Sequence, residues 1–257
     1  MLPFQVMTAQ ATPEMTANSS NVIVMRPTAK KLTRSQLDTL ERIAFDVFEQ
    51  AYTGQYGRIK NAIQRAAPDT LAAFDNSDIW ELEPELVEKA VRKWYEDNAV
   101  RIGRDAFDTI DLDTDWRDVN KTLLETSRAR AAWFSRAMTE TSMEQSQEVI
   151  TKWLYTEGGT IGDLVDNMQG VWTGPRPQTA ALTETTNLVS QSETAVGIAA
   201  GYWGYGVVTR NDSSVRPAHA EAASNGPWPM SDTEHKPPVN GDYNCRCQMY
   251  LVREAPV

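Results

Sequence analysis

The sequence predicts an α+β protein, in which a mainly helical region is followed by a small mixed α/β module with a long proline-rich loop. Apolar residues recur at helical spacing over roughly 140 residues, and two apolar runs with strand character flank the loop. Eight of the 13 prolines lie in 171–257. The first 31 residues include three prolines and show no helical period. We therefore divide the chain into an extended arm (1–31), a helical region (32–170) and a C-terminal module (171–257).

The helical region opens with a capping box, because Thr33 is followed by Gln36 three residues later. An apolar stripe begins at Leu37 and recurs every three or four residues, which predicts a long amphipathic helix. Glycine is common just after the end of a helix, so we expect this helix to end at Gly54. A shorter helix should follow and end before Pro68.

The next helices are predicted from similar signals. Pro84 marks the start of a second long helix, since proline is favoured in the first turn. A third helical stretch follows, and Ser142 with Gln145 forms another capping box that opens a further helix, closed by Gly158 and Gly159. Five tryptophans are expected to anchor the core of this region: Trp80, Trp94, Trp116, Trp133 and Trp153.

The C-terminal module is predicted to be mixed. A short helix over 162–169 precedes it, and after a break at Thr-Gly-Pro-Arg-Pro a longer helix over 178–203 forms its first element. The runs 204–210 and 247–252 are predicted to be strands. The proline- and glycine-rich segment between them is expected to be a loop with little secondary structure. Loops of this length inside a compact module are usually functional or are stabilised by an additional cross-link.

Composition limits the classes of protein to consider. The net charge of −10 predicts at most weak electrostatic contact with DNA, because phosphates call for a basic surface. The chain has no run of 18 apolar residues, so we expect no membrane span, and its first residues do not resemble a secretory signal. Two cysteines cannot build a disulfide framework. These features are typical of a soluble protein that works with protein partners.

The most unusual feature is that both histidines and both cysteines lie within 29 residues of the loop, as His219, His235, Cys245 and Cys247. A metal site is one interpretation. His219, Cys245 and Cys247 are good zinc ligands, and Asp212 would complete a tetrahedron. If the two cysteines lay in a strand, residues i and i+2 would present both sulfurs to the same side. A zinc ion would then hold the loop between the two strands.

Three other interpretations stay open. A disulfide between the two cysteines would close a very small ring. Free buried thiols would act only as small apolar side chains. Catalysis is the third: His219 and His235 would form a general acid–base pair of a small nuclease. An acidic chain without a basic groove does not favour this reading, and we expect the protein not to be an enzyme.

The order of these residues resembles the C-terminal signature of the phage Mu F-like head morphogenesis proteins, also called minor capsid proteins. The matching residues are Asp212, Val215-Arg216-Pro217, His219, Pro237-Pro238 and Asn244-Cys245-Arg246-Cys247. Thr183-Glu184-Thr185 resembles the Arg-Thr-Glu element of the family, with Leu182 where the family usually has arginine. The family also usually carries a histidine before Asn-Cys-Arg-Cys, where this chain has Val-Asn-Gly-Asp-Tyr. If that histidine is a ligand in the family, Asp242 or His235 would have to replace it here.

The resemblance implies a protein of the virion, present in few copies in the phage head or at the portal vertex, and in the host cytoplasm during assembly. It implies association with the portal protein, and with the major capsid or scaffold protein, during procapsid assembly. A role in DNA packaging or exit follows from the same resemblance. The signature covers about 180–250, and the chain ends ten residues after Cys247, so we expect no appended enzyme domain.

Overall fold

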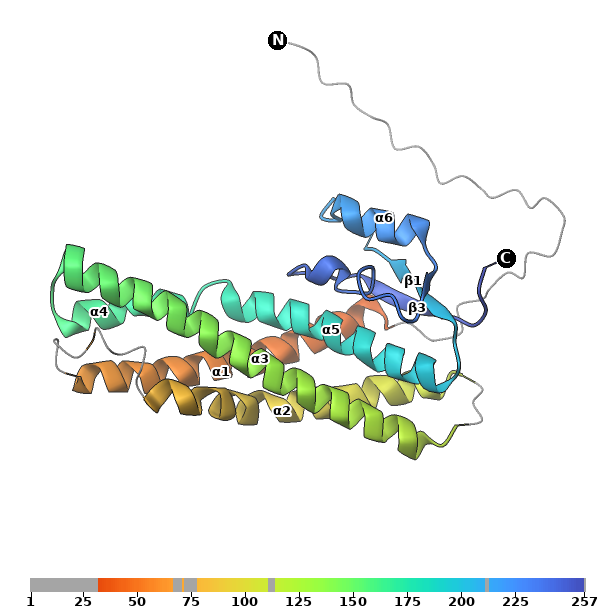
Figure 1. Ribbon diagram of the computed structural model, residues 1–257, viewed down its shortest axis with the longest axis horizontal. Coiled ribbons are helices and arrows are strands. Elements are labelled where there is room, and N and C mark those ends of the chain that lie inside the picture. Colours follow the sequence, from red (N-terminus) through yellow and green to blue (C-terminus); the bar gives the residue numbers. More distant parts are fainter. Residues whose placement is uncertain (1–31, 67–70, 72–77, 111–113, 211–212, 257) are drawn as a thin grey trace, which may run out of the picture.

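A computed structural model of the chain describes residues 32–66, 71, 78–110, 114–210 and 213–256. It confirms the α+β fold class: long helices lie side by side, and a small three-stranded sheet packs near the end of one of them (Figure 1). The arm expected over residues 1–31 lies outside the described residues. Within the described part, no helix is long and apolar enough to cross a membrane.

Helix α1 (Arg34–Arg65) begins at the predicted capping box. The Gln36 amide donates to the Thr33 hydroxyl at 3.3 Å, and the Thr33 amide donates to the Gln36 side chain at 2.8 Å. The predicted end at Gly54 is wrong, because α1 continues to Arg65. A glycine inside a helix costs only about 1 kcal/mol relative to alanine. The buried side chains that follow it, such as Ile59 and Ile63, outweigh this cost.

Helix α2 (Asp78–Phe107) begins before Pro84, contrary to the prediction that this proline marks its start. The extra N-terminal turn brings Trp80 into the core. It also carries Glu83, which is buried and accepts two bonds from Arg58 of α1, at 2.7 and 2.8 Å. These tertiary contacts compensate for the backbone hydrogen bond that a proline cannot donate.

Helix α3 (Trp116–Lys152) is continuous through Ser142, so the capping box predicted there is wrong. Ser142 is fully buried inside the helix, and its carbonyl accepts from Ser146 at 2.6 Å. A π-helical turn (Trp153–Glu157) follows, and Gly158, with φ of 66°, ends it as predicted. Trp133 is half exposed, at 50%, and Trp116 is only partly buried, so these two do not anchor the core as expected.

Two helices precede the sheet. Helix α4 (Ile161–Met168) is short, as predicted, and is followed by a 3-10 turn (Gln169–Val171). Helix α5 (Arg176–Ala199) then runs alongside the long helices, close to its predicted position. Most of its residues are buried, polar ones included, which is typical of a helix covered on several sides.

The C-terminal module has more regular structure than expected. The order along the chain is β1 (Gly204–Val208), α6 (Pro217–Asn225), β2 (Trp228–Pro229), a 3-10 turn (Val239–Gly241) and β3 (Gln248–Val252). The strands form an antiparallel sheet in the order β2-β1-β3. Two corrections follow. The loop contains a helix and a short strand, and β3 begins after the second cysteine, so neither cysteine lies in a strand.

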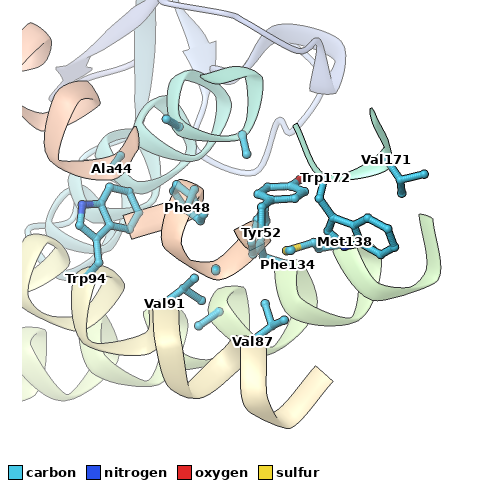
Figure 2. Close-up of a cluster of buried hydrophobic side chains, with 14 of the residues drawn as sticks. Ala44, Phe48, Tyr52, Val87, Val91, Trp94, Phe134, Met138, Val171 and Trp172 are labelled. Atoms are coloured by element: carbon cyan, nitrogen blue, oxygen red, sulfur yellow. The ribbon is translucent and has the colours of Figure 1, made fainter. Parts of the chain in front are cut away.

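The buried apolar residues form two clusters. One lies among the long helices and includes Phe48, whose ring is 5.3 Å from that of Trp94 and 4.8 Å from that of Phe134 (Figure 2). The other joins the sheet to the ends of α2 and α3 and contains both cysteines. Helix α5 contributes Leu188 to the first cluster and Val196 to the second. One helix therefore runs through the helical core and under the sheet, and the division at residue 171 remains a prediction.

Candidate metal centre

Three of the four predicted ligands meet in one place. The Nδ1 atom of His219 lies 3.6 Å from the sulfur of Cys245 and 3.4 Å from that of Cys247. All three donor atoms lie within 4.8 Å of one another, and all three residues are buried. The fourth, Asp212, lies outside the described residues. The structure thus brings together residues that are 26 and 28 positions apart in the sequence.

Helix α6 places the histidine. Arg216 is its N-cap, and Pro217 follows as the first helical residue, where its fixed φ and missing amide hydrogen suit the backbone. His219 is therefore in the first turn and points inward, with 3% of its surface exposed. The Arg-Pro-x-His order thus sets both the start of the helix and the direction of the imidazole.

Helix α5 places the two cysteines. Asn244 has a φ of 58°, which turns the chain just before them, and its amide donates to the hydroxyl of Thr183 at 3.0 Å. The hydroxyl of Thr186 donates to the carbonyl of Cys245. Two threonines one turn apart on α5 thus fix the Asn-Cys-Arg-Cys backbone. The sequence linked Thr183 only to a family element and gave no sign of Thr186. A sequence does not distinguish a threonine that faces solvent from one whose hydroxyl binds the backbone of another segment.

The other nitrogen of the imidazole has its own partner. The Nε2 atom of His219 lies 3.0 Å from a carboxylate oxygen of Asp242, which also pairs with Arg216 at 3.3 Å. A carboxylate accepts the Nε2 hydrogen and so leaves the Nδ1 lone pair directed at the two sulfurs. Asp242 was considered as a replacement ligand, but its position is that of a support for the histidine.

Each of the two thiols shifts the pKa of the other. Donation from the Cys247 thiol lowers the pKa of Cys245, although burial acts in the opposite direction. The same hydrogen bond, together with burial, raises the pKa of Cys247 above its ordinary value. A metal ion would bind the two sulfurs as thiolates, which are the form that ligates metals.

The two N···S distances fit a tetrahedral ion. Zinc bonds of about 2.3 Å to sulfur and 2.0–2.1 Å to nitrogen place neighbouring N and S ligands about 3.5 Å apart. The observed N···S distances of 3.4 and 3.6 Å agree with this edge length. Two sulfurs and one imidazole nitrogen are also the donors that zinc prefers. The cluster could therefore hold one metal ion with a fourth coordination position left for another ligand.

Arg246, between the cysteines, points away from the cluster. Its guanidinium donates to Glu41 of α1. Arg210, just after β1, lies 3.4 Å from Asp38 and 4.0 Å from Glu41. Burial raises the pKa of Glu41, although both arginines oppose this shift. These charges attach the C-terminal module to the first helix on the side opposite to the thiols.

His235 does not join this cluster. Its ring stacks on Trp228 at 3.6 Å between centroids, and its Nδ1 lies 3.2 Å from Asp232. Asp232 also accepts a hydrogen bond from the Tyr205 hydroxyl at 2.8 Å. The two histidines are thus held by different carboxylates. His235 belongs to a local network that fixes the segment after β2.

The Thr-Glu-Thr element of α5 has a buried charge at its centre. Glu184 is 3% exposed and accepts from Arg130 of α3 at 2.6 and 2.7 Å and from Tyr95 at 2.8 Å. A guanidinium from α3 therefore neutralises this buried glutamate of α5. Arg130 was not singled out in sequence, because only the packing of α3 on α5 brings it to Glu184.

Comparisons with protein-family models, with curated proteins and with solved structures find no match to this chain. The site is therefore characterised by its own geometry. His219, Cys245 and Cys247 form a buried set that could hold a metal ion, and Asp242 orients the imidazole.

Proposed function

We propose that this protein is a minor capsid protein of a tailed phage, which associates with the portal and assists head assembly and DNA packaging or exit. The proposal rests on the resemblance of its C-terminal residues to the Mu F-like head morphogenesis proteins. One structural observation supports it. Arg216, His219 and Asn244-Cys245-Arg246-Cys247 are spread over the sequence but lie together in one anchored unit.

We further propose that the metal is zinc and that its role is structural. The three ligands are 3%, 2% and 7% exposed, and closed structural sites differ from catalytic ones in lacking an accessible position. Asp212 is the proposed fourth ligand. The ion would connect α6 to the segment before β3. No strand pairing joins these two parts directly.

Metal analysis tests the zinc proposal directly. Protein purified without chelator should contain one zinc per chain, and His219→Ala and Cys245→Ser should each abolish it. His235→Ala is the matched control, because this histidine has other partners, and it should retain the metal. Asp212→Asn should weaken zinc binding without abolishing it, since three ligands remain. Wild-type protein without metal would contradict the proposal.

The proposed partners are the portal protein and, during assembly, the major capsid or scaffold protein. The protein would lie in the capsid interior or at the portal vertex of the virion, and in the host cytoplasm during assembly. A net charge of −10 supports contact with protein more than with DNA. The long helices offer the larger surface for such contacts.

Quantitative mass spectrometry of purified procapsids and mature virions tests this function. A few copies per particle in both would support a minor head component, and cross-linking to the portal would then identify the contact. Presence in procapsids alone would indicate an assembly factor that leaves. Absence from both particles would overturn the proposal. An assay of RNA and DNA cleavage with the His219→Ala and His235→Ala variants would then become the next experiment.

A further inference from the structure

A pocket of about 550 Å³ lies between α3 and α5, and neither cysteine lines it. Pro238, Gly241 and Tyr243 form one part of its wall, and α1 contributes Tyr52. Its volume falls within the range of about 300–1,000 Å³ that is usual for ligand sites in proteins. The helical region and the C-terminal module thus build this pocket together.

The rim of the pocket carries two exposed aromatic rings. Trp133 is 50% exposed and Tyr243 is 70% exposed, whereas Phe134 and Met138 in the wall are buried. Large apolar side chains exposed beside a concave apolar surface mark interaction sites. Tryptophan, tyrosine and arginine are also the residues that contribute most to binding in protein interfaces.

The pocket carries one unbalanced positive charge. Arg130 is neutralised by Glu184 and lies 4.0 Å from the centre of the Trp133 ring. Arg176, in contrast, donates to neutral groups: the carbonyl of Val171, Gln145 at 3.2 Å and Ser142 at 3.5 Å.

The ion pairs found among the described residues include none with Arg176. Its guanidinium lies 5.1 Å from the centre of the Tyr52 ring, which leaves it facing an apolar and aromatic wall. In a chain of net charge −10, this is a local positive site. A carboxylate is the chemical group that an arginine fork binds best.

We propose that this pocket binds a segment of a partner protein that presents a large apolar side chain next to an aspartate or glutamate. The apolar side chain would lie between Trp133 and Met138, beneath Tyr243, and the carboxylate would pair with Arg176. The apolar walls, the two rim aromatics and the unbalanced guanidinium support a peptide of this chemistry. The inference goes beyond the proposed function, since Trp133, Met138 and Arg176, which would contact the peptide, are not among the signature residues.

Binding of two designed peptides to the full chain tests the proposal. The probes are acetyl-Gly-Leu-Phe-Asp-Gly-amide, labelled with a fluorophore, and the same peptide with Asn in place of Asp. We expect the Asp peptide to bind about tenfold more tightly, which is the effect of one charge-assisted hydrogen bond. Arg176→Gln should remove this preference and Arg176→Lys should restore part of it. Trp133→Ala should weaken both peptides.

Tyr155→Ala is the matched control, because Tyr155 is another exposed aromatic, at 78%, and does not line the pocket. It should leave the affinities of both peptides unchanged. Circular dichroism of each variant distinguishes loss of binding from loss of fold. Equal affinities for the two peptides, no binding at millimolar concentration, or an unchanged preference in folded Arg176→Gln would each overturn the proposal.

A photo-cross-linking amino acid at position 133 of the full chain identifies other occupants. A cross-link to residues 1–31 of the same chain would assign the pocket to the N-terminal segment and overturn the proposal. A cross-link between two copies, with a dimer in light scattering, would assign it to self-association and also overturn it. A cross-link to the added Asp peptide, reduced by Arg176→Gln, is the expected result.

Discussion

His219 and Asp242 are joined through Nε2 and a carboxylate oxygen at 3.0 Å, on the side of the imidazole opposite to the two thiols. Such a pairing fixes the ring and directs its free nitrogen, which is how ligating histidines are usually supported. The Asp242 side chain is 38% exposed, whereas that of His219 is 4% exposed. Asp242 thus lies between solvent and the three buried ligands.

This pairing gives the first prediction. Asp242→Asn should weaken zinc binding about 10- to 100-fold while keeping all four proposed ligands. Competition with a chelator of known affinity measures the change. Asp232→Asn is the control, since Asp232 makes the same kind of contact with His235. Equal weakening in both variants would show that Asp242 has no special role.

The buried ion pair of α3 and α5 gives the second prediction. Glu184→Gln should lower the free energy of unfolding by about 3–5 kcal/mol, because Arg130 would keep its charge in a partly buried place without a carboxylate partner. Urea unfolding measures the change. Glu96→Gln, which breaks the exposed pair with Arg128, should cost less than about 1 kcal/mol. Similar losses in the two variants would contradict this account.

The third prediction concerns two glycines whose replacement by alanine should change the stability of the protein in opposite directions. A Cβ atom at Gly204 would lie 2.0 Å from the carbonyl oxygen of Trp228 in the neighbouring strand, so Gly204→Ala should separate β1 from β2 and destabilise the protein. Gly57, inside α1, has open space around it, so Gly57→Ala should stabilise by about 0.5–1 kcal/mol. Thermal unfolding of both variants checks the signs. A stable Gly204→Ala protein would show that the sheet can adapt.

The network around Asp232 gives a prediction of pH dependence. Burial tends to raise the pKa of Asp232, but hydrogen bonds from the His235 amide and the Tyr205 hydroxyl, with the His235 ring, lower it overall. Because the pKa of Asp232 is lower in the folded state than in the unfolded chain, its carboxylate stabilises the fold fully at pH values above the unfolded pKa of about 4. This stabilisation is lost as the pH falls through the folded pKa.

The unfolding free energies of wild type and Asp232→Asn, compared between about pH 2 and 7, test this linkage. The difference between them should be largest above pH 4 and should shrink in more acidic solution. A difference that stays constant across the range would mean that the carboxylate contributes no proton-linked stability.

Much of the architecture could be predicted from the sequence. The capping box at Thr33, the glycine stop at Gly158 and the strand at Gly204–Val208 depend on local chemistry, so local patterns are enough to identify them. The errors occurred where tertiary contacts outweigh local signals. Gly54 and Pro84 lie inside helices because the residues around them are buried.

The ligand set could be predicted only in part, because the sequence shows the types of donor but not the tertiary contacts around them. His219, Cys245 and Cys247 were identified as soft donors, which are scarce in this chain. Asp242 was recognised only as a substitute ligand, because nothing local distinguishes it from the other acidic residues. Its role depends on which side of the imidazole it occupies, and that is set by the packing of α6 against the segment after Val239.

Asp242 and Tyr243 are neighbours in the chain but serve two different places, since one holds the imidazole and the other borders the pocket. The Arg216 guanidinium bonds both, through the Asp242 carboxylate and the Tyr243 carbonyl. A ligand that shifted this dipeptide at one place would also change its contacts at the other. By thermodynamic reciprocity, any free energy by which metal strengthens peptide binding is equal to that by which peptide strengthens metal binding.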